Sequence, residues 1–182
     1  MFRSLLIATF CFAALPTASA DAVRYRCTGP TTGPIRIISD GDTCRGFVAG
    51  TKQHMFSRMA SGTVLASKDG KTVILVEDYL SGTVDTKRKV VTTDIDSEEI
   101  DNPTVLQIWR DGVRVAFYDI ARLARDVTAL DRSISHVRWV AELPTGLDGA
   151  RFSIVTTSNR RITFDTKTGK IVDEQDVAAK RP

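Results

Sequence analysis

The chain has 182 residues, and 42% of them are hydrophobic, which is ordinary for a protein that folds around one core. Its 25 basic and 22 acidic residues give a formal net charge of +3. This near balance lacks the clustered basic face of a nucleic-acid-binding protein, so we exclude nucleic acid as a partner.

The N-terminus has the three parts of a secretory signal peptide. Arg3 supplies a positive charge, residues 4–15 are uncharged and rich in Leu, Ile, Ala and Phe, and small residues precede Ala20. The apolar stretch is too short to span a bilayer core as a stable helix; a membrane anchor or a buried N-terminal helix is the alternative. We therefore predict cleavage after Ala20 and a periplasmic or secreted location.

Cleavage of residues 1–20 leaves residues 21–182, which we predict to form a single β-rich domain. No stretch in this part approaches about 18 consecutive apolar residues, so we expect no integral membrane segment. The two remaining cysteines, Cys27 and Cys44, should form a disulfide, because an exported chain reaches an oxidising compartment. In the chain-entropy model the closed loop contributes about 3 kcal/mol. A reactive thiol with a resolving thiol is the alternative, although no Cys-x-x-Cys is present.

Short β-type segments alternate with turn signals along the first half of the mature chain. Residues 23–27 alternate apolar and polar side chains, as a half-buried strand does, and residues 35–38 form a second candidate. Residues 63–66 and 72–76 are β-branched stretches joined by a turn that contains Asp69-Gly70. Asp-Gly between apolar stretches is a strong local hairpin signal.

The same pattern returns in the second half. Asp111-Gly112 separates the apolar residues 105–109 from residues 113–118. Three further strands are predicted at residues 152–156, 161–164 and 170–172. This series of hairpins is typical of an all-β, mainly antiparallel fold: a meander or β-sandwich, or a sheet that resembles part of a propeller.

Three segments depart from the hairpin pattern. Asp119 is a candidate cap for one short helix near 119–125, with Leu130 closing the segment against the core. Residues 78–103 are rich in charge, and we interpret them as a long loop, or as an irregular hairpin with Val90 and Val91 in a strand. The C-terminal residues 177–182 should form a frayed tail.

No known arrangement of catalytic residues is present. The sequence contains no Gly-x-Ser-x-Gly elbow, no Walker loop and no His-Glu-x-x-His, so we predict no catalytic residue, no cofactor and no metal site. Zinc sites use Cys and His, and both mature cysteines are expected to be oxidised. His54 has no acidic neighbour in sequence to orient it as a base.

His136 and Arg138 form the candidate binding face. In a strand these two side chains would share one face, while Val137 and Trp139 would share the other. The competing interpretation is the solvent-facing polar side of a core strand. Trp139 and Trp109 both lie in apolar stretches and are expected in the core, with a carbohydrate or partner platform as the alternative.

Carboxylates occur in three places that invite a functional interpretation. The acidic cluster at residues 94–101 begins with the spacing of an EF-hand loop, but Glu99 stands where that loop needs glycine, so we expect a solvated loop. Glycosidases need two carboxylates across a cleft, and the adjacent pairs Glu77 with Asp78 and Asp173 with Glu174 are available. Both pairs should be exposed at strand ends and uninformative.

Together these features predict an exported, non-enzymatic binding module of the bacterial-type cell envelope. Its partner would be an envelope or secreted protein, recognised as an inhibitor, immunity-like or assembly factor does. The order of the turns and of the strand that contains His136 resembles that of exported bacterial β proteins, a resemblance that implies no activity. A hydrolase acting on cell-wall glycan or polysaccharide is the alternative, and a structural subunit with a large exposed apolar patch is a third reading.

Overall fold

The computed structural model describes residues 27–28, 35–40, 43–48, 54–57, 62–95, 98–133, 136–147 and 149–178. These residues form small β-sheets, of which four are antiparallel throughout and one is mixed, together with one short α-helix. The predicted all-β, mainly antiparallel class is therefore confirmed. Within the described residues the sheets close neither a barrel nor a propeller.

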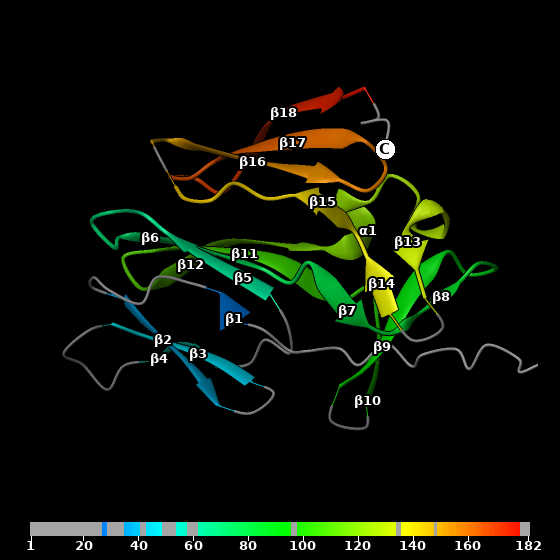
Figure 1. Ribbon diagram of the computed structural model, residues 1–182, viewed down its shortest axis with the longest axis horizontal. Coiled ribbons are helices and arrows are strands. Elements are labelled where there is room, and N and C mark those ends of the chain that lie inside the picture. Colours follow the sequence, from blue (N-terminus) through cyan, green and yellow to red (C-terminus); the bar gives the residue numbers. More distant parts are fainter. Residues whose placement is uncertain are drawn as a thin grey trace, which may run out of the picture.

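A five-stranded sheet occupies the middle layer of the molecule (Figure 1). Every residue of its central strand β6 is buried, which requires a covering layer on both faces. Figure 1 shows the sheet β15–β18 above this layer and the sheet β2–β4 below it. The strands of the middle layer, in spatial order, are β1 (Cys27–Thr28), β5 (Gly62–Ala66), β6 (Thr72–Val76), β11 (Thr104–Arg110) and β12 (Val113–Asp119).

Two predicted hairpins build most of this middle layer. Strands β5 and β6 pair antiparallel across Asp69-Gly70, and the carboxylate of Asp69 accepts hydrogen bonds from Ser67 Oγ and the Lys71 amide at 2.7 and 3.1 Å. Strands β11 and β12 pair across Asp111 and Gly112, whose φ angles are 48° and 78°. At Asp111-Gly112, two consecutive residues with positive φ match the right-handed twist of a hairpin. The strand pairing confirms the predicted hairpin at both Asp-Gly turns.

The C-terminal sheet covers the upper face of the middle layer. Tyr118 of β12 meets Phe164 edge-on at 5.2 Å, and its hydroxyl donates to the Gly169 carbonyl at 2.6 Å. Phe152 packs beside Phe164 at 5.7 Å between ring centres. This sheet consists of β15 (Val140–Glu142), β16 (Arg151–Thr156), β17 (Arg160–Asp165) and β18 (Ile171–Asp176), which confirms the three predicted strands.

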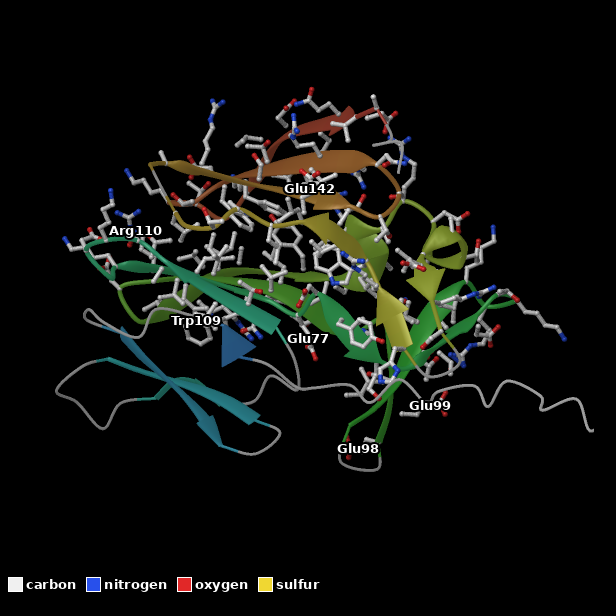
Figure 2. The ribbon with its side chains drawn as sticks, viewed as in Figure 1. Glu77, Glu98, Glu99, Trp109, Arg110 and Glu142 are labelled. Carbon is white, nitrogen blue, oxygen red and sulfur yellow. The ribbon has the colours of Figure 1, made fainter. Side chains whose placement is uncertain are left out.

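The long loop predicted for residues 78–103 is wrong, and the irregular hairpin that we kept as its alternative is closer. Leu80 and Val91 are buried, so apolar side chains anchor this charged region to the core. Glu98 and Glu99 are exposed and lie on a projecting hairpin (Figure 2). The strands are β7 (Tyr79–Ser81), β8 (Thr83–Asp85), β9 (Val90–Ile95) and β10 (Glu98–Asp101).

The predicted short helix is present as α1 (Ile120–Leu123). The Asp119 side chain caps it by accepting a hydrogen bond from the Arg122 amide at 2.7 Å. Ile120 and Leu123 are buried on one face. A 3-10 turn, η1 (Val127–Ala129), follows, and Leu130 closes the segment against the core as expected.

The N-terminal sheet contains β2 (Ile35–Asp40), β3 (Thr43–Val48) and β4 (His54–Ser57), which confirms a strand at residues 35–38. Residues 1–26 lie outside the described part, and with them the signal peptide and most of the strand predicted at 23–27. The side chains of Cys27 and Cys44 also lie outside it, so the disulfide stays a prediction. At the C-terminus, the Val177 amide still donates to the Asn159 carbonyl at 2.8 Å, and the tail beyond residue 178 is outside the described part.

Candidate functional site

Three short strands bring the candidate binding residues together. Arg138 lies between Asp131 on one neighbouring strand and Tyr79 on the other, and His136 lies opposite Ser81. Directly opposite residues in an antiparallel sheet share a face, so these side chains converge on one side of the sheet. The three strands are, in spatial order, β13 (Asp131–Arg132), β14 (His136–Arg138) and β7.

A surface hollow of about 310 Å³ lies over this face. We call it the β14 hollow, and its lining includes two arginines, one aspartate, one serine and the paired rings of Tyr79 and His136. Both residues that the sequence singled out as a binding face line it. Its lining residues are Tyr79, Asp131, Arg132, Ser133, His136 and Arg138.

The interpretation of His136 as a solvent-facing residue is wrong, because only 8% of the residue is accessible. Its ring stacks on Tyr79 at 4.9 Å between centres and 17° between planes. The stack buries the imidazole although its strand face is polar. Val137 and Trp139 are fully buried, as expected for the opposite face.

Arg138 presents a fixed positive charge at the rim of the β14 hollow. It is exposed, and its Nε donates to the Val140 carbonyl at 3.1 Å, which orients the guanidinium plane. The remaining guanidinium nitrogens can donate to an acceptor in the fork geometry that suits a carboxylate. Burial raises the pKa of the nearby Asp78, and the charge of Arg138 partly opposes that rise.

Sequence reasoning missed four of the six lining residues: Tyr79, Asp131, Arg132 and Ser133. No local pattern marks these residues. Tyr79, for example, reaches the site only because β7 pairs with β14. Arg138 and Asp131 share the strand face under the hollow, whereas Arg132 lies opposite the buried Val137. The exposed Arg138 can offer its charge to an anionic group. The arrangement can therefore hold a carboxylate beside a flat aromatic surface.

Glu77 and Asp78 are not the exposed carboxylates that we predicted. Both are partly buried and connect β6 to β7 in the chain. Figure 2 labels Glu77. Burial, and then the charge of Asp78, raise the pKa of Glu77 to about 7. The Glu77 backbone is held on both sides, since its amide donates to Val105 at 2.8 Å and its carbonyl accepts from Trp139 Nε1 at 2.5 Å.

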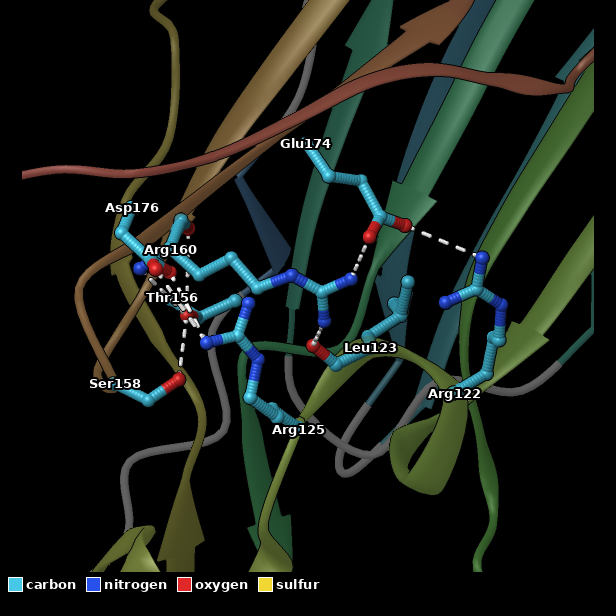
Figure 3. A network of polar contacts seen from close by, with 8 residues as sticks. All are labelled: Arg122, Leu123, Arg125, Thr156, Ser158, Arg160, Glu174 and Asp176. Atoms are coloured by element: carbon cyan, nitrogen blue, oxygen red, sulfur yellow. Dashed lines mark hydrogen bonds and ion pairs between the residues drawn. The ribbon is translucent and has the colours of Figure 1, made fainter.

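The second carboxylate pair, Asp173 and Glu174, lies on β18 and is exposed as predicted. Glu174 nevertheless has a structural task, because Arg160 and Arg122 both bind its carboxylate (Figure 3). Neither this pair nor Glu77 with Asp78 lines the β14 hollow. The hollow therefore lacks the two carboxylates across one cleft that a glycosidase needs.

The acidic cluster at residues 94–101 includes the end of β9 and the strand β10. The prediction that it forms a loop is therefore wrong. The Asp101 carboxylate binds Arg88 and accepts from Thr92 Oγ1 at 2.9 Å. The side chain of Asp94, all of Asp96 and the side chain of His54 are outside the described part. Among the side chains that are described, no three His, Cys, Asp or Glu residues gather in a way that could hold a metal ion.

The two tryptophans differ. Trp139 is fully buried, which confirms its place in the core. Trp109 is only half-buried, and its Nε1 donates to Gln107 Oε1 at 3.3 Å. Figure 2 shows Trp109 on the side of the middle layer that looks toward β2–β4. As for membrane insertion, the described residues include no helix with the length and apolar character to cross a bilayer.

Comparison with known proteins adds no family. No family model matches the sequence, and no curated protein matches it. One similar solved structure is the crystal structure of the mitotic checkpoint complex, with a TM-score of 0.25 and 11% sequence identity. That likeness covers 95% of this chain and 75% of the other chain. At this score it supports no inference about fold or function.

Proposed function

We propose that the protein is an exported, non-enzymatic binding module of the bacterial-type cell envelope that recognises a protein partner. The observation that carries the proposal is the β14 hollow, in which Arg138 lies opposite Tyr79, whose ring stacks on His136. Arginine with an aromatic surface is typical of residues that dominate protein interfaces. The signal peptide and the cysteine pair of the sequence support export.

The size of the hollow favours one group from a larger partner over a free small molecule. Its volume of about 310 Å³ lies at the bottom of the range of about 300–1,000 Å³ for small-molecule pockets. Such pockets are mostly apolar, whereas this lining is charged and polar. We infer that an acidic side chain of the partner enters the hollow and meets Arg138.

Exchange of Arg138 tests the proposal directly. Tagged wild-type protein should recover a specific partner from envelope extract, and Arg138→Glu should lose it, because the reversed charge repels a carboxylate. Arg161→Glu is the matched control, since Arg161 is an exposed arginine on β17 away from the hollow. Recovery of no specific partner, or equal loss with both variants, would contradict the proposal.

Export is tested on the purified protein. Mass spectrometry of protein made with its native N-terminus should find a chain that begins at Asp21. Thiol labelling under denaturing conditions should leave Cys27 and Cys44 unlabelled until a reductant is added. An intact chain in the cytosol with both thiols reactive would refute this part of the proposal.

A second candidate is a hydrolase of cell-wall glycan, favoured by one observation. Glu77 has a pKa of about 7, the range in which a carboxylic acid can act as a general acid at neutral pH. The test is release of reducing ends from purified peptidoglycan at pH 6 to 7. Activity that disappears in Glu77→Gln would replace the binding proposal, and no release by wild type would remove the hydrolase.

A further inference from the structure

The strand β12 carries large exposed apolar residues at an edge of the middle layer. Val113 is 64% exposed, Val115 is 37% exposed and Phe117 is 59% exposed. Val115 and Phe117 share a face, whereas Val113 lies opposite Arg110 beyond a bulge. Ala116 and Tyr118 pack against the core. The strand is at the edge of its sheet and pairs only with β11 among the described strands. Three large exposed hydrophobic residues on one edge strand are typical of an interaction surface.

Arg114 adds a positive charge to this surface. Its guanidinium lies 4.9 Å from the centre of the Phe117 ring, in a cation–π contact. The register of β12 shifts at Val115, where a bulge places Arg114 opposite Trp109. We call Arg114, Val115, Phe117 and Trp109 the β12 patch.

The charge of the β12 patch is not neutralised within the described part of the chain. The neighbouring Arg110 lies 3.6 Å from the Asp111 carboxylate. For Arg114 the described contact is the ring of Phe117, and no described carboxylate lies within ion-pair distance. The patch thus combines an apolar surface with a cation that has no acid of its own.

We infer that the β12 patch docks a partner protein through a segment that carries apolar side chains next to a carboxylate. The apolar side chains pack on Val115 and Phe117, and the carboxylate meets Arg114. A second copy of this chain fits less well, because a two-fold contact would present the same patch to Arg114, and the patch contains no carboxylate. The bulge at Val115 twists the edge, so side-chain contacts rather than a long added strand hold the segment.

The β12 patch is independent of the β14 hollow. None of its residues lines the hollow, and its strand belongs to a different sheet. The inference therefore goes beyond the proposed function and survives if the exchange of Arg138 has no effect. It also gives the chain a second surface through which an assembly can form.

Two short peptides test the chemistry of the patch. One is a capped five-residue peptide of alternating Val and Glu, and the other replaces each Glu with Lys. In ¹⁵N-labelled full-length protein, the acidic peptide should shift the amide resonances of residues 113–119, and the basic peptide should not. Arg114→Glu should reverse this preference. Phe117→Ser should weaken binding of the acidic peptide at least about tenfold, the loss expected when an aromatic anchor is removed.

Val172→Ser provides the matched control, because Val172 is 48% exposed on β18, at an edge of another sheet. In this variant the acidic peptide should shift the resonances of residues 113–119 as it does in wild type. Equal binding of the acidic and basic peptides, or shifts confined to the β14 hollow, would overturn the inference. Sedimentation that shows a wild-type dimer and a Phe117→Ser monomer would also overturn it, in favour of a second copy.

Discussion

The fold raises the pKa of Glu77 into a range where the pH dependence of unfolding can be measured. Its carboxyl is partly buried beside Asp78, and its pKa rises from the ordinary 4.5 to about 7. The folded state therefore holds the proton more tightly than the unfolded chain does. The stabilisation from protonated Glu77 is fully present below pH 4.5 and is lost as the pH rises through about 7.

We predict that the free energy of unfolding falls by at most about 3 kcal/mol between pH 4.5 and 7.5 because of Glu77. Glu77→Gln, which mimics the protonated acid, should remove most of this fall. Urea unfolding followed by tryptophan fluorescence at several pH values measures it. Glu142→Gln is the control at another partly buried glutamate, and an unchanged pH profile in Glu77→Gln would contradict the predicted pKa.

At the scale of single elements, β18 is attached to α1 by a charge network. Arg160 is 5% exposed, and its guanidinium donates to the Leu123 carbonyl at 3.2 Å and binds the Glu174 carboxylate. Arg122 of α1 binds the other carboxylate oxygen at 3.2 Å. Burial alone would raise the pKa of Glu174, but the hydrogen bond and charge of Arg160 and the charge of Arg122 lower it overall.

We predict that Glu174→Gln lowers the free energy of unfolding by about 2 kcal/mol at pH 7, because it leaves the buried Arg160 without its anion. The neighbouring Asp173→Asn should change it by less than about 0.5 kcal/mol, as an exposed site does. The pKa of Glu174 is lowered in the folded state, so its contribution should also fade as the pH drops below about 4.5. Chemical denaturation of both variants at pH 7 and pH 4 checks the sign.

Local patterns predicted β12 but not its unusual burial. Residues 113–118 show a strand because apolar and polar residues alternate there, and the strand is present. The pattern alone suggests that Val113, Val115 and Phe117 face a core. The structure places Ala116 and Tyr118 there instead, because these residues fit against the turn at Gly169.

At the scale of the whole molecule, Gly169 joins two layers. It has a φ of 73°, and a side chain at this position would collide with Cβ of Ala116 on β12. Gly112 has a similar φ of 78° but open space around it. An alanine at Gly112 would therefore cost free energy through backbone strain alone. An alanine at Gly169 would cost free energy through the same strain and through steric overlap with β12.

We predict that Gly112→Ala lowers the free energy of unfolding by about 1 kcal/mol, from left-handed backbone strain alone. Gly169→Ala should lower it by about 3 kcal/mol, because steric overlap adds to the same strain. Adding Ala116→Gly to Gly169→Ala should recover part of the loss, so the two changes should not be additive. Thermal unfolding of the three variants and the double variant measures this, and additive effects would refute direct contact.

The amino-acid sequence was enough to predict the all-β class, the hairpins at Asp69-Gly70 and Asp111-Gly112, and the cap of α1. Each depends on neighbouring residues, and local backbone preference is readable from a short stretch. It also placed Trp139 in the core, because an apolar stretch must be buried somewhere.

The β14 hollow, the raised pKa of Glu77 and the exposed apolar residues of β12 could not be predicted, because each depends on segments that are distant in the chain. Tyr79 meets His136 through pairing between strands far apart in the chain. The acidity of Glu77 depends on burial that its neighbours in sequence do not reveal. Which face of a strand is covered depends on what packs against it, and that is a property of the assembled layers.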